Sequence, residues 1–272
     1  MAGPDTIEPL DLRFAPDELQ PVVDTITTFI EDTVADAAAT QVILGLSGGI
    51  DSTTAAHLAV EALGAEAVRG MVLPGRVSHE ENMSDAERVA MNLGIAYDVI
   101  EIQPFVDDLV EAVPEVEDDQ LAVGNTRARV RMVLNYLLAN HEGGLVLGTG
   151  NRTEALVGYF TKHGDGAVDC NPLGGLYKQQ VRQVARSLGI DEDLVTKTPT
   201  AGLWAGQTDE DELGIDYDTL DAILALHVDS DLSTGATARV LSVDRETVRQ
   251  VRAMVDRSEH KRHRPPAPTS LT

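Results

Sequence analysis

The strongest constraint on the fold of this chain is a short glycine-containing segment between an apolar run and a helical pattern. Residues 45–52 read Gly-Leu-Ser-Gly-Gly-Ile-Asp-Ser and directly follow the apolar run 42–44. Such a run is typical of a buried parallel strand. Beyond Asp51, apolar residues recur with the i, i+3, i+4, i+7 spacing of one helix face, and Gly64 follows as a C-terminal stop. The segment is therefore predicted to be the turn of a strand–turn–helix unit.

A turn of this kind presents free backbone N–H groups at a helix N-terminus, where an anion such as a phosphate is favoured. Gly48 and Gly49 let phosphate oxygens approach the backbone without an intervening Cβ. Asp51 predicts a bridging Mg²⁺, because a carboxylate beside a phosphate would otherwise be repelled. No lysine follows the glycines, so this is not the GxxxxGK(S/T) loop. The alternative interpretation is a glycine turn whose Ser or Asp only caps the helix.

The charge balance is the second informative feature. The chain has 21 basic and 45 acidic residues, a net charge of −24. Its lysines are only Lys162, Lys178, Lys197 and Lys261, and the remaining basic residues are arginines. Many acidic residues with few lysines and few aromatics favour a protein from a salt-accumulating halophile, and an acidic mesophilic protein is the alternative. An acidic surface also argues against nucleic acid as a partner.

Targeting and membrane signals are missing from the sequence. There is no run of 18 apolar residues, so no membrane span is expected. The first residues lack the basic start and apolar core of a signal peptide. A single cysteine, Cys170, forms no internal disulfide and fits a reducing compartment, so a cytoplasmic location is expected.

Strand and helix patterns alternate along the first half of the chain. Strands are predicted over 42–44, 68–73, 96–100 and 145–147, and helices over 16–38, 50–63, 80–93 and 120–140. This alternation indicates a Rossmann-like, doubly wound parallel sheet in an α/β fold, with flanking helices. Ligands bind at the carboxyl ends of strands in such sheets. The turns after residues 44 and 147 are therefore expected to face one crevice.

One domain is expected over residues 1–272, because nothing in the middle marks a linker. It would comprise an N-terminal helix (16–39), a nucleotide-binding core (41–190), a substrate loop with a helical part (196–264) and a flexible tail (265–272). The stretches 158–176 and 198–214 lack periodicity, and loops of this length are usually functional or disordered. Helices are predicted again over 220–227, 234–241 and 245–255, and the Pro-rich tail region is expected from 258.

The glycine segment resembles the SGGxDS loop of the ATP pyrophosphatases, and later segments narrow the resemblance to the NAD synthetases. Residues 124–132 (GNTRARVRM) are similar to their GNxxARxRM helix, and 158–169 (GYFTKHGDGAVD) to their GFFTKxGDGxxD loop. The other similar segments are 148–154 (GTGNRTE), 197–204 (KTPTAGLW), 206–214 (GQTDEDELG) and 258–263 (SEHKRH). These motifs occur in the family's order from about Pro16 to Pro266.

The resemblance implies a two-step amidation. The nicotinate carboxylate of deamido-NAD attacks the α-phosphate of ATP, releases pyrophosphate and leaves an NAD-adenylate, which ammonia then converts to NAD with release of AMP. Positioning and charge stabilisation are expected to dominate such a reaction. The resemblance also implies a homodimer, with residues 120–140 as a reasonable contact helix. Free ammonia is the expected nitrogen donor, because the similar region starts near Pro16 and leaves no room for an amidase domain ahead of it.

The resemblance also assigns site residues. Asp51 and Glu154 would be Mg²⁺ ligands, and with Lys178 they form the expected catalytic set. The residues assigned to ATP are Gly45, Leu46, Ser47, Gly48, Gly49, Ile50, Asp51, Ser52, Thr149, Lys178 and Thr200. The residues assigned to deamido-NAD are Arg129, Lys162, Asp169, His260 and Lys261.

Two details of the sequence limit these assignments. On a helix, Arg127 and Arg131 share one face and Arg129 points roughly the opposite way. The family match favours Arg129 for the dinucleotide, so the other two are expected at the surface or in structural roles. Gly150 replaces a frequent family Asp, and residues 74–78 (PGRVS) differ from the usual Pro-Tyr-Gly-Val. No adenine-pocket residue is therefore assigned after Leu73.

Other functions remain open from the sequence. Another ATP pyrophosphatase, such as a GMP synthetase or a tRNA-modifying enzyme, shares the first loop but lacks the 158–169 and 206–214 motifs. A tRNA enzyme would also need a basic surface. A non-catalytic nucleotide-binding module needs neither a second carboxylate such as Glu154 nor two long substrate loops. Cys170 directly follows Asp169, whose charge raises a thiol pKa, so a small buried side chain is expected there rather than a nucleophile.

Overall fold

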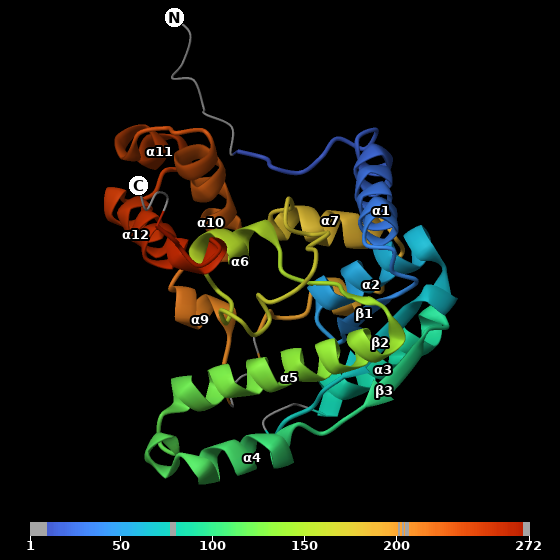
Figure 1. The fold of residues 1–272 in the computed structure, drawn as a ribbon. Coiled ribbons are helices and arrows are strands. Elements are labelled where there is room, and N and C mark those ends of the chain that lie inside the picture. The colour runs from blue at the N-terminus through green and yellow to red at the C-terminus, as the bar shows by residue number, and fades with distance from the viewer. Residues whose placement is uncertain (1–9, 77–79, 201, 203, 205–206, 269–272) are drawn as a thin grey trace, which may run out of the picture.

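The computed structural model describes residues 10–76, 80–200, 202, 204 and 207–268. Within these residues, the centre is a four-stranded parallel sheet in the order β3-β2-β1-β4 (Figure 1). The strands are β1 (Val42–Gly45), β2 (Val68–Val72), β3 (Ala96–Val99) and β4 (Leu145–Val146). In β1, Val42 pairs with Val68 on one side and with Leu145 on the other. The predicted parallel α/β sheet is confirmed.

Helices cover both faces of the sheet, because successive side chains of β1 point to opposite sides. Val42 and Leu44 pack into one core, and Ile43 packs into the other. The helices that contribute to the first core are α1 (Leu19–Asp36), α2 (Ile50–Leu63), α3 (Glu80–Leu93), α7 (Lys178–Ser187) and α8 (Glu192–Val195). The opposite core is closed by α4 (Gln103–Ala112) and α5 (Gln120–Glu142), which lie side by side in Figure 1.

A third core lies in the C-terminal part and packs beside the carboxyl edge of the sheet. Its largest fully buried side chain is Tyr217. The elements that build it are α6 (Arg152–Val157), α9 (Asp209–Leu213), α10 (Tyr217–Ile223), the π-helical turn η3 (Leu224–Asp229), α11 (Thr234–Leu241) and α12 (Arg245–Arg262). Two short 3₁₀ turns, η1 (Ala65–Ala67) and η2 (Pro114–Val116), complete the order of elements. No helix in the described part of the chain is long and apolar enough to cross a membrane.

The structure differs from the predicted elements in several places. Helix α4 was not predicted, although its apolar residues Phe105, Val106, Leu109 and Val110 recur with helical spacing. The predicted loop 198–214 contains α9, and the helix expected over 220–227 changes to π-helical geometry from Leu224. Helix α12 continues to Arg262, so the segment from 258 is helical rather than tail. Helix α1 begins at Leu19 instead of Pro16. The single-domain organisation stays a prediction.

Candidate active site

The Ser-Gly-Gly segment forms the predicted turn between β1 and α2. Gly49 is the N-cap of α2, and the hydroxyls of Ser47 and Ser52 lie 3.0 Å apart across the turn. Gly48 has a φ of +73°, and a Cβ placed there would lie 2.2 Å from the carbonyl oxygen of Asn82. Any other residue at Gly48 would be strained and would collide with backbone, so the turn requires glycine. The backbone of this turn lines a cavity of about 710 Å³.

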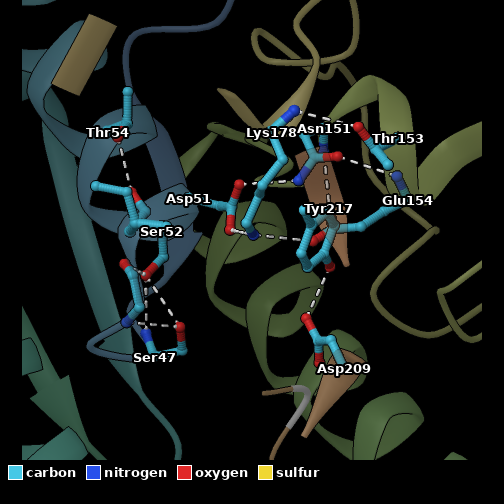
Figure 2. A network of polar contacts seen from close by, with 12 residues as sticks. Ser47, Asp51, Ser52, Thr54, Asn151, Thr153, Glu154, Lys178, Asp209 and Tyr217 are labelled. Atoms are coloured by element: carbon cyan, nitrogen blue, oxygen red, sulfur yellow. Dashed lines mark hydrogen bonds and ion pairs between the residues drawn. The ribbon is translucent and has the colours of Figure 1, made fainter. Parts of the chain in front are cut away.

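A buried lysine lies between two carboxylates beside this turn. Figure 2 shows Lys178, at the start of α7, reaching toward Asp51 at the start of α2. Its ammonium donates a hydrogen bond to Asp51 and lies 3.4 Å from Glu154 Oε1. Only 1% of Lys178 is exposed. The three residues predicted as the catalytic set therefore come together, although they belong to three different helices.

Asn151 ties the two carboxylates to each other, a role that the sequence analysis did not assign. Its side chain donates to Asp51 Oδ1 at 2.9 Å and accepts from the backbone N–H of Glu154 at 3.0 Å. The Glu154 carboxylate accepts in return from the Asn151 backbone N–H at 3.2 Å, which completes a capping box. An Asn three residues before a Glu at a helix start is the sequence signal that could have identified this contact.

The cluster has an unusual electrostatic balance because it is buried. Burial raises the pKa of Glu154 to about 8, and the Lys178 cation offsets part of this increase. Burial alone would lower the pKa of Lys178, but the attraction of Asp51 and Glu154 outweighs it and raises the pKa. Lys178 therefore stays protonated and places a fixed positive charge beside the Ser-Gly-Gly turn.

A further carboxylate, Asp209, lies next to this cluster and was not singled out from the sequence. It is 3% exposed, lines the cavity and accepts the Tyr217 hydroxyl at 2.8 Å (Figure 2). Its Oδ1 atom is buried and has no hydrogen-bond partner among the described residues. The ring of Tyr217 lies under Lys178, whose ammonium is 5.0 Å from the ring centroid. The position of Asp209 in the GQTDE motif was the only available signal.

The donor set suits Mg²⁺ in chemistry. Asp51 and Glu154 offer carboxylate oxygens toward the same cavity, and the buried Asp209 Oδ1 leaves an acceptor without a partner. Hard oxygen donors of this kind, completed by phosphate and water, are what Mg²⁺ prefers. Within the described ranges, however, no group of three or more His, Cys, Asp or Glu side chains is preassembled as a metal centre. The protein thus offers a partial set of ligands that a nucleotide could complete.

Most of the residues assigned to ATP surround the cavity. Thr149 and Thr200 line it together with the turn, and the Thr200 hydroxyl donates to the carbonyl of Gln207. Ser52 lies under the turn and is not part of the lining. One side of the cavity is closed by apolar residues from the ends of β2 and β4, namely Met71, Val72, Leu73, Val146 and Leu147. Leu73, after which no adenine-pocket residue was assigned from the sequence, is therefore part of the cavity wall.

The residues assigned to deamido-NAD fall into two places. Lys162 donates to the carbonyl of His260 at 2.8 Å, and Arg129 donates to the carbonyl of Lys162 at 3.3 Å. Lys261 donates to the carbonyls of Gly158 and Phe160, at 2.7 and 2.8 Å, and it lines the cavity. These four residues are therefore linked in one surface cluster beside the cavity.

Asp169 lies apart from that cluster. It accepts the Tyr136 hydroxyl at 3.0 Å and the backbone N–H of Val146 at 2.7 Å, and it is not part of the cavity lining. The following Cys170 is partly buried, and burial together with the Asp169 charge raises the pKa of its thiol to about 11. The expected unreactive cysteine is consistent with this environment.

The arginines of α5 have different surroundings. Arg131, not Arg129, lies on the face that lines the cavity, and its Nε donates to the carbonyl of Leu73 at 2.9 Å. Arg129 is exposed outside the lining. Burial lowers the pKa of Arg131 to about 10, so it remains a cation at neutral pH. Sequence spacing separates the faces of a helix but does not orient them, so the face of α5 that lines the cavity is seen only in the structure. The assignment of Arg129 to the dinucleotide stays a prediction.

The arrangement of parallel sheet, phosphate-type turn and adjacent buried cation defines a nucleotide-binding α/β protein. Comparison with known proteins makes this class specific. The profile of the NAD synthase family matches residues 22–265. The chain belongs to the NAD synthase family.

Named relatives agree with this result. The chain is 61% identical over 268 residues to the NH₃-dependent NAD⁺ synthetase of Halobacterium salinarum (strain R1), covering 98% of this chain and all of the relative. It is 46% identical over 245 residues to the enzyme of the same name from Pyrococcus furiosus, covering 90% and 94%. The halobacterial relative agrees with the halophilic origin expected from the charge and the few lysines.

Solved structures share the fold. An NMN synthetase from Francisella tularensis is similar with a TM-score of 0.83 and 32% identity, covering 94% of this chain and all of that chain. The NH₃-dependent NAD synthetase of Campylobacter jejuni is similar with a TM-score of 0.77 and 29% identity, covering 92% and 98%. The fold class inferred from the sequence is therefore confirmed.

Proposed function

We propose that this protein amidates deamido-NAD to NAD with ammonia, in two steps that consume ATP and release pyrophosphate and AMP. The observation that carries the proposal is the buried Lys178 between Asp51 and Glu154, directly beside the Ser-Gly-Gly turn. A nucleotide whose phosphates lie on this turn meets backbone N–H groups on one side and the ammonium on the other. Both are needed where negative charge develops at the α-phosphate.

In the first step, a carboxylate oxygen of deamido-NAD bonds to the α-phosphorus of ATP, and the bond to the β-phosphate oxygen breaks. Lys178 neutralises charge on the phosphate oxygens as pyrophosphate leaves. In the second step, ammonia adds to the activated carbonyl, a proton is lost, and AMP departs with the former carboxylate oxygen. The chain holds and orients the reactants, and none of its side chains needs to become covalently attached.

Mg²⁺ is proposed as the metal, held by Asp51 and Glu154, and when bound it would neutralise triphosphate charge. Asn151 holds the two carboxylates in place, because its side-chain NH₂ donates to Asp51 and its backbone N–H donates to the Glu154 carboxylate. Asp209, with its unpartnered Oδ1, is a further acid available to the same cation. A cation at this place would offset the negative charge of the triphosphate and of the neighbouring carboxylates Asp51, Glu154 and Asp209, beside which Lys178 is the buried ammonium.

Local cations let an acidic protein bind two polyanionic substrates. Three of the four lysines of the chain line the cavity, together with Arg131, and they are Lys178, Lys197 and Lys261. Lys162 and Arg129 extend this positive region along the rim, and with Asp169 and His260 they are proposed to hold the dinucleotide, in part across a dimer interface. The few lysines of this chain are thus concentrated where a polyanion would bind.

A homodimer is proposed, formed through α4 and α5. These two neighbouring helices carry most of the large exposed apolar side chains of the described residues, namely Phe105, Leu109, Leu121, Val133 and Leu137. Exposed apolar side chains gathered on two adjacent helices of an otherwise acidic protein favour a protein interface there. A second copy is the simplest occupant, because one copy would then cover the identical face of the other.

The decisive assay uses purified chain with ATP and Mg²⁺ in molar KCl. Deamido-NAD is offered with ammonium or with glutamine, and nicotinate mononucleotide is offered in parallel because one similar structure is an NMN synthetase. We expect NAD and pyrophosphate in equal amounts, only with deamido-NAD and ammonium. Efficient turnover of the mononucleotide alone would reassign the substrate. Pyrophosphate release without either acceptor would favour another ATP pyrophosphatase.

A further inference from the structure

Asp221 is a fully buried carboxylate behind the catalytic cluster, outside the cavity lining. It lies on α10, and none of its surface is exposed. Its Oδ1 accepts the hydroxyl of Thr153 at 2.5 Å, and its Oδ2 accepts the backbone N–H of Gln179 at 3.0 Å. Neither donor is a cation, and burial raises the pKa of Asp221 to about 6. Keeping this buried carboxylate ionised at neutral pH costs folding free energy, and a role in the site would explain why the residue is kept.

The two donors to Asp221 are the immediate neighbours of two catalytic side chains. Thr153 precedes Glu154 in α6, and Gln179 follows Lys178 in α7. The backbone N–H of Lys178 also donates to the Thr153 hydroxyl at 3.1 Å, a contact drawn in Figure 2. A closed set of three hydrogen bonds therefore joins the N-termini of α6 and α7 through one carboxylate. Thr153 is fully buried, so water does not compete for these bonds.

We propose that Asp221 is a positioning residue for adenylyl transfer, which clamps α6 to α7 and so fixes Glu154 relative to Lys178. The proposal rests on the function proposed above. A carboxylate suits this task because it has two acceptor oxygens, one for each donor. An amide at the same place has one acceptor oxygen, which can take the Gln179 N–H, and its NH₂ group can meet the Thr153 hydroxyl only if that hydroxyl turns from donor to acceptor. The clamp then loses its charge-assisted bonds to a carboxylate and keeps weaker neutral ones.

The magnitude of the effect follows from the geometry of the cluster. The Lys178 ammonium is 3.4 Å from Glu154, and it must meet the phosphates at hydrogen-bond distance to be useful. A displacement of about 1 Å in such a site costs up to ~10²-fold in rate. We therefore expect Asp221→Asn to lower kcat about tenfold or more. The KM for deamido-NAD should change less than about twofold, because Asp221 lies outside the cavity.

The experiment measures kcat, the KM values for ATP and deamido-NAD, and the midpoint of thermal unfolding. The variants are Asp221→Asn, Thr153→Val, their double variant and Thr153→Ser. Asp218→Asn is the matched control, because it changes the same residue type on the same helix at a side chain that is 71% exposed. We expect Thr153→Ser to keep near wild-type kcat, since it retains the hydroxyl. Thr153→Val should lose about as much as Asp221→Asn. The double variant should lose little more than either single variant, because all three break one linkage.

Several results would overturn the proposal. Wild-type kcat in folded Asp221→Asn would do so, as would equal losses in Thr153→Ser and Thr153→Val. Multiplicative losses in the double variant would show two independent effects. If Asp221→Asn does not fold, the Thr153 pair alone decides the outcome. Failure of the wild-type chain and of Asp218→Asn to make NAD would instead refute the proposed function, and Mg-ATP affinity across the same variants would then test the clamp.

Discussion

Replacement of Lys178 by alanine removes a buried cation that contacts both Asp51 and Glu154. Coulomb's law with an effective dielectric constant of ~20 gives about 5 kcal/mol for the 3.4 Å pair with Glu154 when that carboxyl is ionised, which its raised pKa of about 8 places above neutral pH. Removing one partner of a buried ion pair typically costs ~3–5 kcal/mol, because the remaining charge is uncompensated. The variant can limit this loss by protonating Glu154, whose pKa burial already raises to about 8.

The rate should fall more clearly than the stability. A fixed donor that meets developing charge is worth ~10²–10³ in kcat, so Lys178→Ala should lose at least ~10²-fold in NAD formation. Lys197→Ala is the matched control, because Lys197 forms a comparable ion pair with Asp85, lines the same cavity and does not contact Asp51. It should lose much less activity.

The assay is steady-state NAD formation in molar KCl with Mg²⁺, and circular dichroism at the assay temperature confirms that both variants are folded. A selective loss in Lys178→Ala supports a role of its charge at the phosphates. Equally small losses in the two folded variants would refute the reasoning, because they would show that the buried ammonium stabilises the free protein and contributes nothing to the reaction.

Three further predictions concern the metal, the nitrogen source and the assembly. Asp51→Asn should keep the fold but lose at least ~10²-fold in pyrophosphate release at saturating Mg²⁺, and wild-type turnover would exclude Asp51 as a ligand. With glutamine and no ammonium, no NAD should form. Glutamine-driven synthesis of NAD that Cys170→Ala abolishes would contradict ammonia as the nitrogen donor. At fixed total ammonium, the rate of NAD formation should rise with pH above neutral, because NH₃ is the nucleophile. Leu137→Asp, on the exposed face of α5, should convert a dimer to a monomer in light scattering at high salt. Met91→Asp on α3 should not, although Met91 is 62% exposed and Leu137 is 64% exposed. An active wild-type monomer would refute the dimer.

The sheet and the Ser-Gly-Gly turn could be predicted because their signals are local. An apolar run, two glycines and a helical repeat define the unit around residues 42–63 without reference to the rest of the chain. Parallel strands then place the turn after β1 and the turn after β4 at one edge. The motif match added Lys178 and Glu154, and the structure brings both to Asp51.

The remaining features depend on contacts that sequence spacing does not encode. Helix α7 has few apolar residues, and its importance lies in Lys178, whose partner Asp51 is 127 residues away in the chain. That Arg131 rather than Arg129 lines the cavity depends on the orientation of α5 against the sheet. The burial of Asp221 could not be predicted from the sequence, because a carboxylate on a short helix is usually solvated. Here the packing of the third core buries it.

The central claim is that a carboxylate oxygen of deamido-NAD attacks the α-phosphorus of ATP on the turn beside Lys178. Deamido-NAD labelled with ¹⁸O in its nicotinate carboxylate tests this directly, with ATP, Mg²⁺ and ammonium at high KCl and mass spectrometry of the products. The account predicts one ¹⁸O in each AMP and none in pyrophosphate. Unlabelled AMP together with formation of NAD would contradict an adenylate intermediate, and label in a phosphate or in pyrophosphate would place the attack at a different phosphorus.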